Sequence, residues 1–309
     1  MRKLLSLTMA WGLAHASLFA QVLDVASVQK VDLPETAPPV LAAISPQADY
    51  LLLTQPDNRS LVRYQLNTGQ IDTVSDAPGA GYAPQLTADG GTIVFRTTTY
   101  ADGVRRLTGL SQHHVGTRRT TTLLQPTRRL QGLAVRGQAM TAIEGGRPRR
   151  KALGEKAVAN ETPVLSIDNR QLMITRGTDT RVLSPNGTQA SYIWPSLSPD
   201  GRQVLYYMCG RGAYVCDLDG QHPRYLGHYT APRWYNDQVV VAMDDHDDGQ
   251  RITASSIVAI GLDGQVQTLT PDTLVATYPQ AAGEKGVIAF STPEGDTYLI
   301  RVNTTTNTH

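Results

Sequence analysis

The sequence predicts an all-β protein: a six-bladed β-propeller with four antiparallel strands in each blade and a ring closed by an N-terminal strand. Two observations predict this fold. Residues 194–226 show the pattern of four consecutive short strands, and parts of that pattern recur elsewhere in the chain. Helical periodicity is hard to find beyond residue 20. A propeller suits such repeats because its radial sheets leave only short, protected edges.

The repeating unit is clearest between Trp194 and Leu226. Its first turn, at residues 198–201, has the sequence Ser-Pro-Asp-Gly, in which proline presets one φ angle and glycine accepts a positive φ. The next segment, residues 202–208, is rich in Val, Leu and Tyr, as a strand should be. A turn at residues 210–212 precedes the third strand, and a turn at residues 219–221 precedes the fourth. These residues therefore predict one complete blade.

Copies of this unit are marked by a proline near the start of the first strand. Pro195, Pro232 and Pro279 lie 37 and 47 residues apart, and Pro84 marks an earlier copy. Such spacings match the length of a propeller blade. We count six units, of which the third is drawn out over residues 130–183 by an insertion at residues 145–160.

The last unit supplies only three strands, and the segment at residues 21–33 is the candidate for the fourth. Its apolar positions include Val25, Val28 and Val31. An open blade would expose an unpaired sheet edge, so we expect this segment to close the ring. The alternative is a disordered tail. The predicted boundaries place the propeller at residues 34–303 and a polar tail at residues 304–309.

The first 20 residues predict a secretory signal peptide. A basic start, Met1-Arg2-Lys3, precedes a mostly apolar run with small residues near its end. The alternative is an uncleaved membrane anchor, but the run is short and contains His15. We therefore expect a periplasmic or secreted protein that does not insert into the membrane after cleavage. The net charge of +1 gives no reason to expect a nucleic-acid partner, and we expect a monomer.

The two cysteines, Cys209 and Cys216, flank one turn of the clearest blade. A disulfide between them is plausible in an oxidising compartment. The alternative is a pair of free thiols, because a tight turn would place the two residues out of register and disulfide geometry is strict. The sequence leaves both possibilities open.

With its units laid out, the chain resembles the propeller of the TolB family. The resemblance rests on the Pro-x-x-Ser-Pro-Asp-Gly signature at residues 195–201 and on its degraded copies, and it covers residues 34–303. It implies an exported propeller used as a scaffold or binding module. In the TolB family an α/β domain precedes the propeller, and this sequence has no counterpart of that domain between the leader and the first blade.

Candidate binding residues gather on the loops that lead into the first strands and on the middle hairpin turns. These loops share one face, and binding residues concentrate on loops held by a rigid scaffold. Aromatic and arginine side chains dominate binding energy, which selects Tyr82, Arg129, Tyr192, Trp194, Arg233 and Tyr278. Arg149 in a basic loop and Asp247 in an acidic loop complete the set. The alternative for each aromatic residue is packing between blades.

The acidic loop, residues 244–249, raises the question of calcium. His246 stands where a calcium loop needs an oxygen ligand, and no glutamate follows at the required distance. We therefore predict no metal and no cofactor, and a solvated charged loop instead.

The predicted function is a non-catalytic binding or scaffold module, similar to TolB, that engages a cell-envelope protein or peptide over the channel mouth. Nothing in the sequence matches a hydrolase nucleophile elbow. The alternative is a glycan-active enzyme, a polysaccharide lyase with a histidine-bound metal. Only His228 and His246 are placed for that chemistry in the predicted fold, and fold alone does not decide function.

Overall fold

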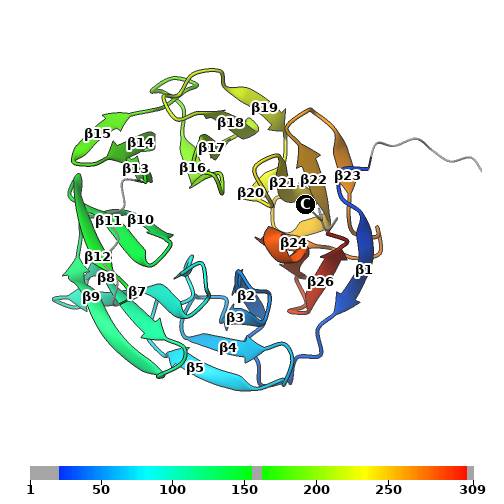
Figure 1. Cartoon of the computed structure of the whole chain (residues 1–309), viewed down its shortest axis with the longest axis horizontal. Coiled ribbons are helices and arrows are strands. Elements are labelled where there is room, and N and C mark those ends of the chain that lie inside the picture. Colours follow the sequence, from blue (N-terminus) through cyan, green and yellow to red (C-terminus); the bar gives the residue numbers. More distant parts are fainter. Residues whose placement is uncertain (1–20, 155–161, 305–309) are drawn as a thin grey trace, which may run out of the picture.

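The computed structural model describes residues 21–154 and 162–304 and folds them into a ring of seven antiparallel sheets (Figure 1). The protein is therefore an all-β propeller, and the predicted count of six blades is wrong. The predicted signal peptide lies outside the described residues. Within the described part of the chain, no helix is long and apolar enough to cross a membrane.

The blades follow one another in chain order. Blades 1 to 4 consist of β2 (Val40–Ile44), β3 (Tyr50–Thr54), β4 (Leu61–Gln65) and β5 (Ile71–Ser75); β6 (Gln85–Leu86), β7 (Thr92–Ala101), β8 (Arg105–His114) and β9 (Arg119–Thr127); β10 (Leu130–Arg136), β11 (Ala139–Glu144) and β12 (Arg147–Ala152); and β13 (Val164–Asp168), β14 (Gln171–Arg176) and β15 (Asp179–Val182).

Blades 5 to 7 consist of β16 (Tyr192–Leu197), β17 (Gln203–Met208), β18 (Gly212–Asp217) and β19 (Arg224–Gly227); β20 (Thr230–Trp234), β21 (Val239–Asp247), β22 (Ile252–Gly261) and β23 (Val266–Thr268); and β24 (Thr277–Ala282), β25 (Val287–Ser291), β26 (Thr297–Val302) and the N-terminal strand β1 (Val25–Lys30). A short 3-10 helix, Gly283–Lys285, links β24 to β25.

The seventh blade comes from the drawn-out third unit. Residues 130–183 form two separate sheets, each with three strands in the described residues. The two strands that the sequence pattern did not reveal, β12 and β15, are almost wholly exposed. They are held by pairing with β11 and β14, respectively, so their sequences carry no apolar alternation. A count based on hydrophobic pattern therefore merged two blades into one.

The N-terminal strand β1 lies at the outer edge of blade 7, where it pairs antiparallel with β26 from Val25↔Val302 to Lys30↔Tyr298. The preceding residues contact blade 6. The Gln267 side chain of β23 accepts hydrogen bonds from the backbone N–H groups of Val22 and Leu23, both at 2.8 Å. The segment thus joins the outer strands of two neighbouring blades.

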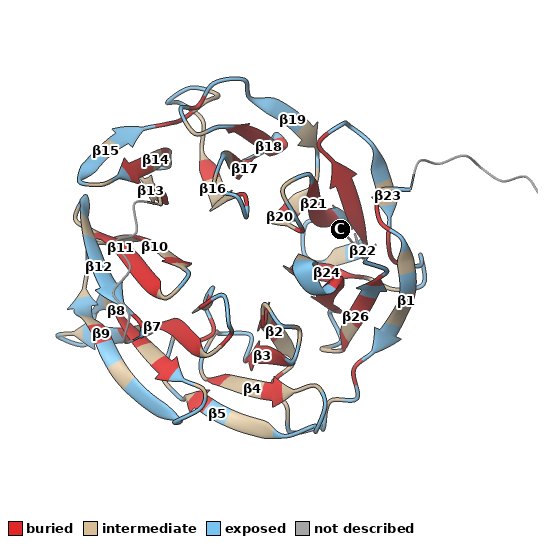
Figure 2. Ribbon diagram, in the orientation of Figure 1, coloured by how far each residue is buried: buried red, intermediate tan, exposed pale blue. Residues whose placement is uncertain are grey.

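The core consists of apolar layers between neighbouring blades. Figure 2 shows buried residues concentrated on the middle strands and exposed residues on the outer ones. All five residues of β3 and all five of β25 are buried. One apolar cluster spans blades 6 and 7 and includes Phe290, Met243 and Ile300. This packing makes the ring a rigid frame for its loops.

Three blades repeat the same bulge in their first strand. In each one, an X-Pro dipeptide adds one residue to the first strand relative to the second strand of the blade. The dipeptides are Trp194-Pro195, Ala231-Pro232 and Tyr278-Pro279. The residue before the proline has a φ of 51°, 47° and 51°, respectively. A positive φ is uncommon outside glycine, and bulges re-aim side chains next to binding sites.

The two cysteines are free thiols, so of the two possibilities that the sequence leaves open the structure has the free thiols and not the disulfide. Cys216 is buried and pairs with Val204 on β17, whereas Cys209 is exposed just beyond the end of that strand. Five positions along an extended strand correspond to about 16 Å. That separation greatly exceeds the span of a disulfide.

Candidate functional site

One face of the ring carries the segments that enter the first strands together with the turns between second and third strands. This arrangement follows from the up-and-down order of the strands in each sheet. The hairpin formed by β21 and β22 is longer than most others in the ring, with nine and ten residues in its two strands. Its tip, residues 248–251, is exposed.

A pocket of about 340 Å³ lies on this face, and we call it the mouth pocket. It is formed by the starts of the first strands of blades 5, 6 and 7 and by the β21–β22 hairpin. Its lining combines aromatic, apolar and charged side chains: Trp194, Thr230, Met243, Asp245, Asp247, Gly249, Gln250, Arg251, Ile252 and Tyr278. Three of the predicted binding residues, Trp194, Asp247 and Tyr278, are thereby brought together.

The aromatic walls of the mouth pocket are the bulge residues Trp194 and Tyr278. The Trp194 ring rests against Tyr207, with the ring centroids 5.4 Å apart. The backbone N–H of Tyr278 donates a hydrogen bond to the sulfur of Met243, at 3.1 Å, while about half of the Tyr278 surface stays exposed. The positive φ at each residue therefore places a large ring at the mouth without breaking the sheet behind it.

A larger groove adjoins the mouth pocket, and we call it the apolar groove. Its volume is about 730 Å³. It shares Arg251, Ile252 and Tyr278 with the mouth pocket and runs over blades 7 and 1. Most of its other apolar lining is aliphatic or proline: Pro39, Val40, Leu41, Pro56, Val275 and Pro293.

Two further predicted residues, Tyr82 and Arg233, do not line the mouth pocket. The Arg96 guanidinium lies over the exposed Tyr82 ring, 5.3 Å from its centroid, and donates hydrogen bonds to the carbonyls of Tyr82 and Ala83. Arg233 donates to the carbonyl of Pro232. Burial lowers the pKa of both guanidinium groups, and the Tyr82 phenol lies within electrostatic reach of each. Side chains from blades 2 and 6 therefore approach one another here.

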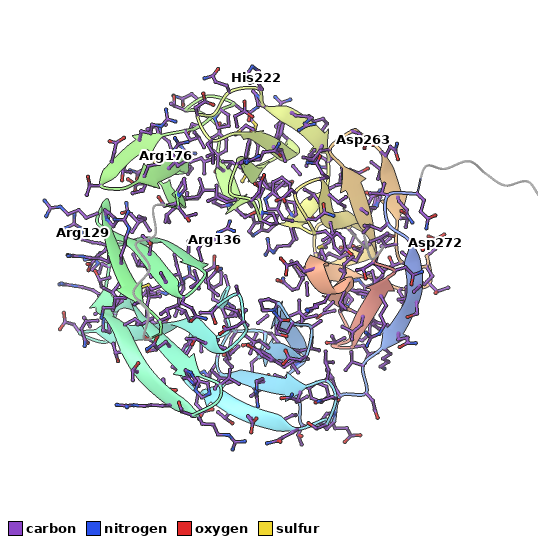
Figure 3. The ribbon with its side chains drawn as sticks, in the orientation of Figure 1. Arg129, Arg136, Arg176, His222, Asp263 and Asp272 are labelled. Atoms are coloured by element: carbon purple, nitrogen blue, oxygen red, sulfur yellow. The ribbon has the colours of Figure 1, made fainter. Side chains whose placement is uncertain are left out.

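Arg129 and Arg149 lie in a separate basic pocket on blade 3. The two residues share this pocket, of about 380 Å³, with Glu144, and Arg149 Nε is 3.0 Å from a Glu144 carboxylate oxygen. Figure 3 shows Arg129 toward the outside of the ring. The prediction that Arg129 rings the channel mouth is therefore wrong.

Tyr192 is wholly buried, and its predicted position on the binding face is also wrong. Its hydroxyl accepts a hydrogen bond from the Asn186 N–H and donates one to the Gly187 carbonyl, both at 2.9 Å. Its ring packs on Tyr206, with the ring centroids 5.6 Å apart. The alternative of core packing therefore holds at this position.

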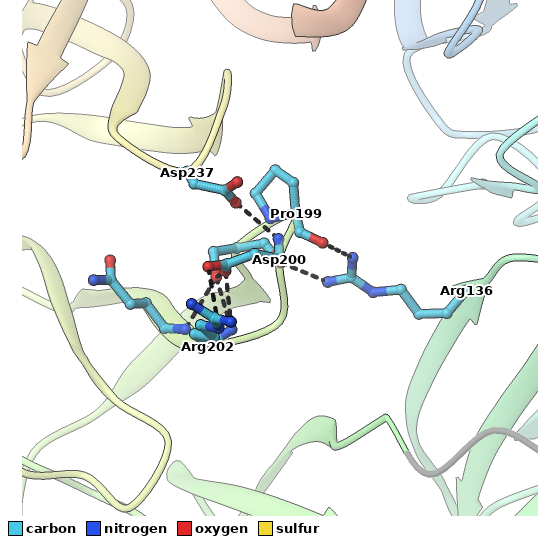
Figure 4. Close-up of polar contacts among 7 residues, drawn as sticks. Arg136, Pro199, Asp200, Arg202 and Asp237 are labelled. Atoms are coloured by element: carbon cyan, nitrogen blue, oxygen red, sulfur yellow. Dashed lines mark hydrogen bonds and ion pairs between the residues drawn. The ribbon is translucent and has the colours of Figure 1, made fainter.

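The opposite face carries a polar network around the Ser-Pro-Asp-Gly turn of blade 5 (Figure 4). Arg136 of blade 3 lies near the centre of the ring in Figure 3 and donates to the Ser198 and Pro199 carbonyls at 3.1 and 3.3 Å. The Asp200 N–H donates to Asp237 of blade 6 at 2.7 Å. Burial lowers the pKa of Arg136. The signature turn thus ties three blades together, which is a structural role.

Two charged residues of the mouth pocket, Asp245 and Arg251, were not singled out from the sequence, although Asp245 belongs to the predicted acidic loop. Asp245 is half-buried and accepts a hydrogen bond from the Thr230 hydroxyl. Arg251 closes the tip of the hairpin. The alternation of a strand places Asp245 and Asp247 on one face, but this signal was lost because the run of charged residues at 244–249 favoured a loop.

No group of three or more His, Cys, Asp or Glu side chains in the described residues is arranged to hold a metal ion. His228 and His246 are both exposed, and neither lines the mouth pocket. The His228 ring contacts the Arg211 carbonyl oxygen, at 3.4 Å.

No protein-family model and no curated protein sequence matches the chain. Solved structures do match. U3-55K aligns with a TM-score of 0.60 at 10% identity over 90% of this chain and 99% of that chain. A chain of the mitotic checkpoint complex aligns with a TM-score of 0.59 at 9% identity, over 98% and 99% of the two chains.

An oligogalacturonate lyase in complex with manganese aligns with a TM-score of 0.49 at 17% identity, over 84% of this chain and 76% of that chain. At such identities these likenesses show the fold alone. The chain is a β-propeller, and its resemblance to the TolB family stays a prediction from the sequence.

Proposed function

We propose that this propeller is a non-catalytic binding module, and that it holds a segment of a partner protein across the mouth pocket and the apolar groove. The partner is a cell-envelope protein or peptide. The protein meets it as a monomer in the periplasm or outside the cell, after export by the leader at residues 1–20. The described residues do not include that leader, so the location rests on its sequence alone.

One observation carries the proposal: the mouth pocket and the apolar groove adjoin through Arg251, Ile252 and Tyr278. Together their lining residues extend over four neighbouring blades. Ligand sites of about 300–1,000 Å³ are typically apolar with a few placed polar groups. The apolar groove fits that description, whereas the lining of the mouth pocket includes three charged residues. Exposed aromatic residues such as Tyr278 are typical anchors of protein interfaces.

The glycan-active enzyme is the second candidate from the sequence. It requires histidines that converge on a metal, and the described geometry of His228 and His246 supplies no observation in its favour. The binding module is therefore the function that the mouth supports best.

The experiment is capture of a partner from envelope extract, followed by mass spectrometry and by affinity measurement with the captured protein. Trp194→Ala and Tyr278→Ala remove the two aromatic walls. Each change should weaken binding by roughly 1–2 kcal/mol, which is about 5- to 30-fold in Kd. Tyr225→Ala is the matched control, because Tyr225 is 53% exposed, close to the 51% of Tyr278, but lies on the outer strand β19.

The proposal predicts that Tyr225→Ala binds like the unaltered protein. If the Tyr225 change abolishes capture while the Trp194 and Tyr278 changes leave it intact, the partner uses the outer surface and the proposed site is wrong. Thermal unfolding of every variant separates lost binding from lost folding.

A further inference from the structure

The mouth pocket contains more negative charge than its own residues neutralise. Asp245 and Asp247 line it, and Arg251 is the only cationic side chain among its lining residues. Arg251 already has a partner, because its Nε lies 3.8 Å from a carboxylate oxygen of Asp248, which is not a lining residue. Within the described residues, neither Asp245 nor Asp247 forms an ion pair of its own.

Each of these two carboxylates is oriented by one donor. The Thr230 hydroxyl donates to Oδ1 of Asp245, and the Gly249 N–H donates to Oδ1 of Asp247 at 2.8 Å. Among residues 21–154 and 162–304, no hydrogen bond or ion pair engages the second oxygen, Oδ2, of either carboxylate. The pocket therefore presents acceptor oxygens that are held in place and available to a ligand.

Aromatic rings stand beside these oxygens. Trp194 and Tyr278 line the same pocket, and Tyr207 supports the Trp194 ring from behind, with the centroids 5.4 Å apart. The charge of Asp245 reaches this aromatic group: the pKa of Tyr207 is raised first by burial and then by that carboxylate. A cation over an aromatic face is attracted by the ring quadrupole, most strongly when the ring is tryptophan.

We infer that the mouth pocket receives the side chain of an arginine or lysine from the partner segment, with Asp245 and Asp247 accepting its N–H donors and Trp194 and Tyr278 flanking its cationic group. This inference rests on the proposed function and names the chemistry that the same site selects. A guanidinium fits best, because it combines planar stacking with several donors in a fixed fork. The apolar groove then receives the residues next to that side chain.

An organic cation fits the site better than a metal ion does. Calcium takes six to eight oxygen ligands, whereas the described residues contain no group of three acidic, histidine or cysteine side chains arranged to hold a metal. A guanidinium is satisfied by a few acceptors and an aromatic face. The pocket volume of about 340 Å³ also exceeds what a bare ion requires.

The test uses two probes that share one shape and differ in charge: N-acetylarginine amide and N-acetylcitrulline amide. Isothermal titration calorimetry of the purified protein should show saturable binding of the arginine probe, at least about tenfold tighter than that of the citrulline probe, a ratio equivalent to about 1.4 kcal/mol. Asp245→Asn and Asp247→Asn should each reduce this preference. Asp263→Asn is the control, because Asp263 lies in a turn on the opposite face and should leave the preference unchanged.

Three results would overturn the inference: equal affinity for the two probes, no saturable binding of the arginine probe, or displacement of that probe by calcium in a manner that requires Asp245. If the two probes bind equally but partner capture still depends on Trp194, the proposed binding module is supported and only the selectivity for a cation is refuted. Thermal unfolding of the asparagine variants confirms that any loss reflects charge.

Discussion

The N-terminal segment offers the most direct test of how the ring is held together. Its strand β1 supplies the outer edge of blade 7. Leu23 is bound to blade 6 through the Gln267 side-chain amide, which accepts a hydrogen bond from the Leu23 N–H and donates one to the Leu23 carbonyl at 3.0 Å. The perturbation is deletion of residues 21–32. It removes the strand, uncovers the edge of β26 and strips apolar side chains from the core between blades 6 and 7.

The expected magnitude follows from burial. Leu23 and Val31 are 7% and 9% exposed, and burying one such side chain contributes about 1.5–3 kcal/mol. The two together therefore contribute about 3–6 kcal/mol to the free energy of unfolding, before the half-buried valines of β1 are counted. A typical domain has a total of about 5–15 kcal/mol, so the deletion should remove a large share of it.

The assay is urea unfolding followed by circular dichroism. Leu23→Ala supplies a graded version of the deletion, with an expected loss of about 2–5 kcal/mol, and it serves as the test where the shortened protein cannot be purified. Lys30→Ala is the control, since its ion pair with Asp296 is exposed and should add little. If the deletion and Leu23→Ala both leave the unfolding midpoint where it was, the segment does not stabilise the ring and the reasoning fails.

Two further predictions concern single side chains. In the native, unreduced protein a thiol reagent should label exposed Cys209 rapidly and spare buried Cys216. Burial raises the pKa of the Cys216 thiol to about 12, so little reactive thiolate forms, and denaturation should make this second thiol reactive. Finding no thiol after denaturation would show a disulfide instead. In an NMR titration His222 should show a pKa above the ordinary histidine value, because its ring is hydrogen-bonded to Asp217. His113 should show a pKa below that value, because its ring is buried. Asp217→Asn should cancel the shift of His222 and leave that of His113 unchanged. The His222 contact therefore stabilises the fold at low pH and fades as pH rises through its raised pKa, whereas protonation of His113 in the unfolded chain erodes stability as pH falls.

The sequence predicted the blade and its turns well, because both depend on local chemistry. Ser198 to Gly201 form the expected tight turn, and Gly201 takes a φ of 75°. The pairing of the N-terminal strand with the last blade was also predictable, since that unit was short of one strand. The number of blades was not, because the outer strand β12 (Arg147–Ala152) is a run of exposed, mostly basic residues. Its extended form depends on pairing with β11, which no hydrophobic pattern records.

The candidate site was predictable to the level of the face but not of the pocket. Trp194 and Tyr278 come together because they occupy the same pre-proline position of the blade repeat, and Asp247 joins them from the β21–β22 hairpin on the same face. Tyr192 and Arg129 share the same loops by sequence, yet one points into the core and the other toward the outer basic pocket. The direction in which each side chain points depends on the bulge geometry and on the neighbouring blade, and neither can be predicted from the sequence of one segment.

The repeated bulge has a consequence for how this surface can change. Ala83 and Ala231 occupy the same pre-proline position as Trp194 and Tyr278, with φ values of 45° and 47°. The backbone cost of that conformation, about 1–3 kcal/mol, is therefore already met at all four positions, whatever side chain each one carries. The surface could thus change one blade at a time: an aromatic ring introduced at exposed Ala83, or removed at Trp194 or Tyr278, would alter the mouth while the sheets behind it stayed the same. Ala231 does not offer this freedom, because it is 2% exposed and packs in the core between blades 6 and 7.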